Sequence, residues 1–284
     1  MMRLNDPIYD FEKTIDDCCL GITGNNTLLG RIEKGRGSLI TQGDSYLKSA
    51  MKGELYLIDP INIENEKDPI VFDNLRKSDL VKVYDQYFVS DIKPARRIYE
   101  SLLNSAKEKC PFCGGIGVPR NLDHFLPKAH FPQFSIFPRN LVPACRDCNM
   151  DGKGQSFSTY AEDQIIQPYL DHDRFFLEQW IYCKYNIGDG NIPGDFEYFV
   201  DPPVEWSEID KGRVRKHFSD FNLSKRYGIK AAEYLGTILR QVKYLEDRDL
   251  RQEIKAIIFQ PGIDAVPFPN HWSLGMYQAL VAKY

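Results

Sequence analysis

The chain has 284 residues, of which 43% are hydrophobic and 27% are charged. These proportions are typical of a globular protein and exclude wholesale disorder and fibrous repeats. The formal net charge of −4 excludes a protein that coats nucleic acid through bulk positive charge. No uncharged apolar run reaches the roughly 18 residues of a membrane helix, and the first residues lack the apolar stretch of a secretory signal. We therefore predict a soluble, cytoplasmic protein without membrane contact.

Residues 1–92 form a mixed N-terminal region whose role the sequence does not indicate. Residues 21–39 contain several glycines, but they lack both the Gly-Lys-Ser/Thr pattern and the GxGxxG pattern of phosphate-binding loops. We expect turns between short elements in this segment.

Residues 93–109 have the pattern of an amphipathic helix. Ile98, Leu102, Leu103 and Ala106 form one apolar stripe among charged neighbours. The predicted helix leads directly into the first cysteine pair and opens a module that we place at residues 93–160.

Four of the seven cysteines form two Cys-x-x-Cys pairs, Cys110/Cys113 and Cys145/Cys148. The odd, unevenly spaced set does not fit a disulfide framework. Two such pairs are typical of a tetrahedral zinc–thiolate site. Because a module of this size cannot bury a sufficient core, we expect the zinc to be structural.

The segment between the cysteine pairs contains an ordered set of polar residues. Asp123 and His124 are adjacent, Asn140 begins the run Asn-Leu-Val, and Asn149 directly follows the last cysteine of the set. With its cysteine pairs and the closing Gly-Lys-Gly, this segment resembles the HNH endonucleases, the zinc-stapled version of the ββα-metal fold. The family's last position can be His, and here it is Asn149.

These residue types suit metal-assisted hydrolysis of a phosphodiester. A neutral imidazole with a pKa near ~6.5 can take a proton from water, which fits His124 as general base. Mg²⁺ or Mn²⁺ prefers oxygen ligands, which Asp123 and Asn149 supply, whereas thiolates prefer zinc. The resemblance implies the same roles and makes Asn140 a brace for the loop between the strands. In a regular strand Asp123 and His124 would point to opposite faces, so we expect the strand to end or bulge there.

Positive charge is concentrated in the central module. Residues 93–153 contain ten Lys and Arg against five acidic residues, whereas the rest of the chain is acidic. We therefore expect phosphate contacts to be confined to this module. A second cationic cluster either extends this track or is a solvated helix face: Arg213, Arg215, Lys216, Lys225 and Arg226. The candidate nucleic-acid-binding residues are Arg96, Arg97, Lys128, Arg139 and Lys153.

Residues 161–284 are predicted to be mainly helical. Residues 187–203 are rich in Gly, Pro and Asp and should form a long loop or hairpin, and residues 205–260 should be helical. The prolines after residue 260 predict a loop before a short apolar ending. The expected fold class is α+β, predominantly helical, with a central ββα-metal module and helical flanks.

The leading functional hypothesis is a metal-dependent HNH endonuclease that cleaves DNA. The sequence around the motif is also similar to that of HNH proteins that accompany ATPases in bacterial anti-phage defence, including the Septu type. This resemblance implies an ATPase partner. One alternative is a free-standing nicking, repair or mobile-element nuclease. Another is a catalytically silent, zinc-organised module that binds nucleic acid or protein. The presence of Asp123, His124 and Asn149 together argues against the silent module.

Overall fold

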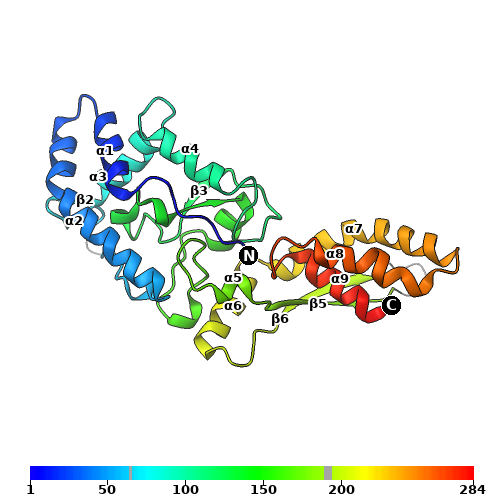
Figure 1. Cartoon of the computed structure of the whole chain (residues 1–284). Coiled ribbons are helices and arrows are strands. Elements are labelled where there is room, and N and C mark those ends of the chain that lie inside the picture. Colours follow the sequence, from blue (N-terminus) through cyan, green and yellow to red (C-terminus); the bar gives the residue numbers. More distant parts are fainter. Residues whose placement is uncertain (64–65, 189–193) are drawn as a thin grey trace.

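The computed structural model describes residues 1–63, 66–188 and 194–284 (Figure 1). The helices are α1 (Phe11–Gly21), α2 (Asn26–Met51), α3 (Lys77–Lys82), α4 (Arg96–Ser105), α5 (Arg174–Leu177), α6 (Glu208–Asp220), α7 (Leu223–Glu246), α8 (Gln260–Asp264) and α9 (Trp272–Lys283). The strands pair into two-stranded antiparallel sheets: β1 (Ile70–Phe72) with β2 (Leu75–Arg76), β3 (Asn121–His124) with β4 (Leu141–Ala144), and β5 (Ile181–Asn186) with β6 (Asp195–Val200). The predicted α+β class with an excess of helix is confirmed. Among the described helices, none has the length and hydropathy needed to span a bilayer.

The N-terminal region is more regular than its sequence suggests. Residues 26–51 form one long helix, α2, so the prediction of turns between short elements is wrong here. Asn25 caps the helix by accepting a hydrogen bond from a backbone amide of the first turn. Gly35 lies on the buried face, where an added Cβ would come within 2.3 Å of Leu75 Cδ1, and Gly43 is similarly crowded by α1. These glycines allow close packing rather than turns.

The central module contains the elements that carry the predicted site. Helix α4 covers the middle of the segment predicted as helical and packs against β3 and β4. The two strands pair in regular register, from Asn121 opposite Ala144 to His124 opposite Leu141. A short helical segment, Asp147–Lys153, begins three residues after the end of β4.

The loop between β3 and β4 is anchored to the N-terminal region. The rings of Phe134 and Phe137 contact the ring of Tyr46 on α2, with centroid distances of 5.0 and 5.1 Å. All three side chains are buried. Helix α2 therefore fixes the loop that follows β3, and through it the end of the strand that carries Asp123 and His124.

The β5–β6 hairpin is the sheet of the C-terminal region. Helix α7 packs against β6 and α9 against β5, forming the right-hand end of the molecule in Figure 1. The hairpin expected around residues 187–203 is present, although residues 189–193 lie outside the described part of the chain. The loop predicted after residue 260 is wrong, because α8 and α9 occupy most of the tail. Helix α8 directly continues a helical segment at Lys255–Phe259, so Pro261 lies within a continuous helical run and leaves one backbone hydrogen bond unmade there.

Candidate metal centre and catalytic cavity

The four predicted zinc ligands form one buried cluster. The Sγ atoms of Cys110, Cys113, Cys145 and Cys148 all lie within 4.8 Å of one another. Sulfur atoms around a tetrahedral zinc, with Zn–S distances near ~2.3 Å, are separated by roughly 3.8 Å. The Cys113 and Cys145 sulfurs are 4.0 Å apart. The cluster could therefore hold a zinc ion with little movement, as the cysteine spacing predicts.

Glycines shape the turn that carries the first cysteine pair. Gly114 has a φ of +62°, and Gly115 a φ of +86°, which L side chains rarely adopt. A Cβ at Gly117 would lie 2.4 Å from Cys145 Sγ, inside the sulfur cluster. The amide of Gly117 donates a hydrogen bond of 3.3 Å to Cys113 Sγ. These positions keep the backbone close enough for the four sulfurs to converge.

Arg226 on α7 also reaches the cluster, a contact that the sequence does not predict. Its guanidinium donates to Cys148 Sγ at 3.2 Å and to Cys145 Sγ at 3.6 Å. Four thiolates around one Zn²⁺ have a net charge of −2, which a nearby guanidinium partly balances. Contacts of this kind orient metal ligands and tune their affinity for the metal. No local sequence pattern links α7 to cysteines about 80 positions earlier.

Asp123, His124 and Asn149 line one cavity of about 180 Å³, which we call the Asp123 cavity. Strand β3 ends at His124, so the expectation that the strand ends at this point is met. Asn149 comes from the Asp147–Lys153 segment, one residue after Cys148. Tyr84 and Lys128 line the cavity as well. The three residues predicted to act together therefore face the same space.

The imidazole of His124 has a fixed orientation. Its Nε2–H donates a hydrogen bond of 2.9 Å to the carbonyl oxygen of Ser135, and its ring lies edge-on to Tyr84 at 4.4 Å. Burial lowers the pKa of His124 to about 3, so the ring is neutral at pH 7. Because a carbonyl oxygen can only accept, the neutral ring carries its proton on Nε2 and its lone pair on Nδ1. His124 can therefore accept a proton at Nδ1.

Asp123 is a buried carboxylate with an unsatisfied oxygen. Its Oδ2 has no hydrogen-bond partner among the residues that the structure describes, and the nearest cation is Lys153 Nζ at 3.4 Å. Burial raises the pKa of Asp123 to about 6, although Lys153 opposes this shift. A carboxylate oxygen that accepts no hydrogen bond, together with an amide side chain on the same cavity, is a donor set that suits a hard divalent cation. The residues present therefore fit the predicted metal.

Asn140 lies behind the cavity and is completely buried. Its Nδ2 donates to the carbonyl oxygens of Leu126 and Phe134 at 3.0 and 3.1 Å, and its Oδ1 accepts from the Leu126 amide at 2.7 Å. These bonds tie together the loop that follows β3. Asn140 thus has the position of a loop brace and does not line the cavity.

Comparison with known proteins identifies one relative over the whole chain. Protein ea31 of Escherichia phage lambda is 36% identical over 298 residues, which cover 99% of this chain and 97% of the relative. The chain belongs to the ea31 family. A second match, the Septu protein PtuB of Bacillus thuringiensis, is 31% identical over 87 residues, which are 29% of this ea31-family chain and 33% of PtuB. No protein-family model and no solved structure matches the chain. The HNH resemblance therefore remains a prediction.

Four of the five predicted nucleic-acid contacts in this ea31-family chain are paired with acidic side chains of the N-terminal region. Arg96 contacts Asp91 at 2.9 Å, Arg97 contacts Asp17 at 2.7 Å, Lys128 contacts Asp85, and Arg139 contacts Asp6 at 3.3 Å. The positive excess counted within residues 93–153 is thus offset by acids that lie elsewhere in the sequence.

Lys153 differs from these four because it is buried rather than available on the surface. Its Nζ donates a hydrogen bond of 2.6 Å to the His124 carbonyl oxygen and faces Asp123. Phosphate binding by Lys153 therefore stays a prediction. In the structure its side chain holds the end of β3 through the His124 carbonyl oxygen.

Proposed function

We propose that this chain is a metal-dependent endonuclease of the HNH type that hydrolyses phosphodiester bonds in DNA. In this proposal β3, β4 and the Asp147–Lys153 segment form the ββα-metal module. The observation that carries it is the convergence of Asp123, His124 and Asn149 on one cavity, where the buried Asp123 Oδ2 accepts no hydrogen bond from the described residues and has only the ion pair with Lys153.

The proposed roles follow from the geometry of the Asp123 cavity. Asp123 and Asn149 would hold Mg²⁺ or Mn²⁺, which when bound polarises the scissile phosphate and neutralises the leaving oxygen. His124 takes a proton from the attacking water at Nδ1, while the Ser135 carbonyl holds the ring in the required tautomer. A phosphate in the cavity raises the proton affinity of the buried imidazole, because a nearby negative charge favours the imidazolium.

The zinc proposed at the cysteine cluster acts on the fold rather than on the substrate. Cys148 is adjacent to Asn149, and Cys145 directly follows β4. A zinc ion bound there would fix the Asp147–Lys153 segment relative to the strands. The Asn149 amide would in this way be held opposite the Asp123 carboxylate.

The biological setting is supported by the two relatives in different ways. The similarity to the Septu protein PtuB supports a role in anti-phage defence. For that setting we propose an ATPase partner that controls cleavage. The full-length relative is a protein of phage lambda, and this favours a second candidate, a nuclease that acts for a mobile element without such a partner. The two settings predict different requirements for activity, which one experiment can separate.

The test is cleavage of supercoiled and linear DNA with Mg²⁺ or Mn²⁺, with and without a candidate ATPase. We expect metal-dependent cleavage by the unaltered chain and its loss in His124→Ala, with the zinc content unchanged. His172→Ala is the matched control, since His172 is exposed and does not line the cavity. Equal cleavage by His124→Ala would exclude His124 as the base. DNA binding without any cleavage would instead support the catalytically silent module.

A further inference from the structure

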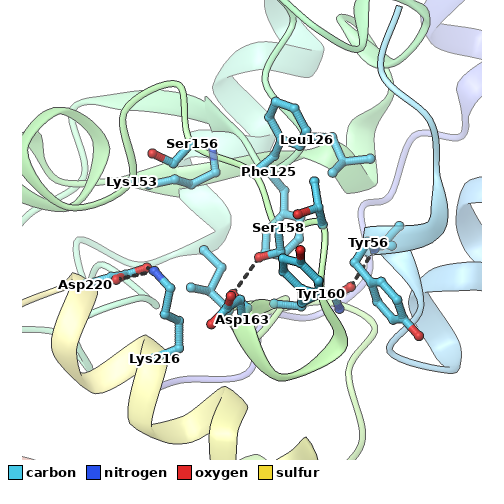
Figure 2. Close-up of a pocket in the computed structure, with 15 residues that line it drawn as sticks. Tyr56, Phe125, Leu126, Lys153, Ser156, Ser158, Tyr160, Asp163, Lys216 and Asp220 are labelled. Atoms are coloured by element: carbon cyan, nitrogen blue, oxygen red, sulfur yellow. Dashed lines mark hydrogen bonds and ion pairs between the residues drawn. The ribbon is translucent and has the colours of Figure 1, made fainter.

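A second pocket lies next to the Asp123 cavity, on the other side of a short stretch of chain. Lys153 and Ser156 line this pocket, whereas Gly154 and Gln155, between them in sequence, line the Asp123 cavity. The stretch from residue 153 to residue 156 is therefore a shared wall. We call the second space the Gln164 pocket, after its most buried polar side chain. Figure 2 shows that its other walls come from the segment after β3, from residues near Tyr56 and Tyr160, and from α6.

The Gln164 side chain supplies an unused hydrogen-bond donor to this pocket. Its Oε1 accepts a hydrogen bond of 2.9 Å from the Tyr56 amide, which fixes the side-chain orientation. Its Nε2 has no partner within the described part of the chain, and the residue is only 2% exposed. A buried donor left unpaired lowers the stability of the fold, so its retention points to a ligand that brings an acceptor.

The charges around the pocket favour an uncharged ligand over a phosphate. Two lysines, Lys153 and Lys216, line the pocket together with two aspartates, Asp163 and Asp220. Lys216 Nζ is paired with Asp220 at 2.6 Å (Figure 2), and Lys153 Nζ is paired with Asp123 at 3.4 Å. Neither lysine therefore presents an uncompensated charge to an anion.

The size and the aromatic lining of the pocket favour a single flat ring system. Its volume is about 210 Å³, below the roughly 300–1,000 Å³ of sites that enclose drug-sized ligands. Tyr160, which is 64% exposed, contributes a ring to the lining, and so does the half-buried Phe157. Aromatic side chains of this kind stack on nucleobases, whose carbonyl oxygens and ring nitrogens accept hydrogen bonds.

From these observations we propose that the Gln164 pocket binds one nucleobase of the nucleic acid whose phosphate occupies the Asp123 cavity. The Gln164 amide donates to an acceptor on the base, and Tyr160 stacks on its face. The inference rests on the proposed nuclease function, since that function supplies the neighbouring phosphate. The base must leave its stack to enter, so single-stranded or locally unpaired substrates are favoured.

Free nucleosides test the pocket independently of cleavage, because they contain no phosphodiester bond. Thymidine, deoxycytidine, deoxyguanosine and deoxyadenosine are titrated onto the full chain by saturation-transfer difference NMR. We expect at least one to bind, and Tyr160→Ser to weaken that binding about tenfold. Tyr244→Ser is the matched control, since Tyr244 is also an exposed tyrosine (56%) but lies on α7, outside the pocket. Gln164→Glu keeps the acceptor for Tyr56 and removes the amide donor, and it should weaken binding as well.

Each outcome has a separate meaning. Binding of none of the four nucleosides, or equal binding by Tyr160→Ser and Tyr244→Ser, overturns the proposal. Displacement of a bound nucleoside by inorganic phosphate would also overturn it, since the pocket would then be an anion site. A chain that cleaves DNA but binds no nucleoside refutes the pocket alone. A chain that binds nucleosides with this variant pattern but cleaves no DNA refutes the nuclease and leaves the base pocket.

Discussion

Lys153 Nζ and Asp123 Oδ2 face each other at 3.4 Å, and both side chains are almost completely buried. Removing one member of a buried ion pair leaves an uncompensated charge, which costs about 3–5 kcal/mol. We therefore expect Lys153→Met to lower the free energy of unfolding by about 3 kcal/mol in buffer without divalent metal. The double variant Asp123→Asn/Lys153→Met should recover part of this loss, with a coupling energy of about 1–3 kcal/mol.

Urea denaturation of the unaltered chain, Asp123→Asn, Lys153→Met and the double variant measures this coupling. The Lys128–Asp85 pair is the control, because it is partly exposed and should couple by less than about 1 kcal/mol. Strict additivity of the Asp123 and Lys153 substitutions would show that the two charges do not stabilise each other.

Asn149→Ala tests the proposed metal site. Removing one of the two protein oxygens should raise the Mg²⁺ concentration needed for half-maximal cleavage by about tenfold or more, because even indirect ligand contacts contribute that much. The zinc content should not change, since the cysteines remain. Met150→Ala, at the exposed neighbouring position, is the control. A metal requirement identical to that of the unaltered chain would remove Asn149 from the metal site.

Arg226→Met tests the contact between α7 and the cysteine cluster. The variant should still bind one zinc ion, but a chelator should remove the metal about 10- to 100-fold faster, because the thiolates lose two charge-assisted hydrogen bonds. Lys225→Met changes an exposed neighbouring cation and should release zinc at the original rate.

By contrast, Cys145→Ser should lose both zinc and solubility. Retention of one tightly bound zinc by Cys145→Ser would rule out the four-cysteine site.

His217 on α6 makes the stability of the fold dependent on pH. Its Nε2 donates to the Phe112 carbonyl oxygen at 2.8 Å, and its Nδ1 faces the Ile166 amide, so the folded chain holds the neutral ring. Burial lowers the pKa of His217 to about 3, and the N-terminal ammonium and Arg213 add to this effect. In the unfolded chain the pKa is about 6.5. Protons therefore bind preferentially to the unfolded chain below that pH, and stability falls as the pH decreases from 6.5 towards 3.

The size of this effect can be measured by urea denaturation at pH 7.5, 6.0 and 4.5. The contribution of His217 should decline by at most about 1.4 kcal/mol for each pH unit below 6.5. His217→Asn should be less stable at pH 7.5 but should lose less stability on acidification. Parallel pH profiles for the two chains would contradict this account. The comparison with the variant separates His217 from the other groups that titrate in this range.

The sequence predicts those parts of the site that depend on local spacing. The two Cys-x-x-Cys pairs hold their sulfurs close through short turns, and the adjacency of Asp123 and His124 at a strand end follows from the chain itself. The roles of Arg226 and Gln164 could not be predicted in this way. Arg226 reaches the cysteines, and the Tyr56 amide reaches Gln164, only in the folded molecule. The sequence does not predict helix α2, because glycines lower helix propensity. Close packing at positions such as Gly35 offsets that loss of stability in the folded chain.

The acidic partners of Arg97, Lys128 and Arg139 have a consequence for how a polyanion would associate with this face. Each of these cations already has a carboxylate from the first 92 residues, so a nucleic-acid phosphate would replace an internal anion. The phosphate still releases its condensed counterion, but the displaced carboxylate takes up a cation from solution, so the net release of ions is smaller. The logarithm of the association constant should then vary with the logarithm of salt concentration less steeply than the number of lysines and arginines in the central module suggests.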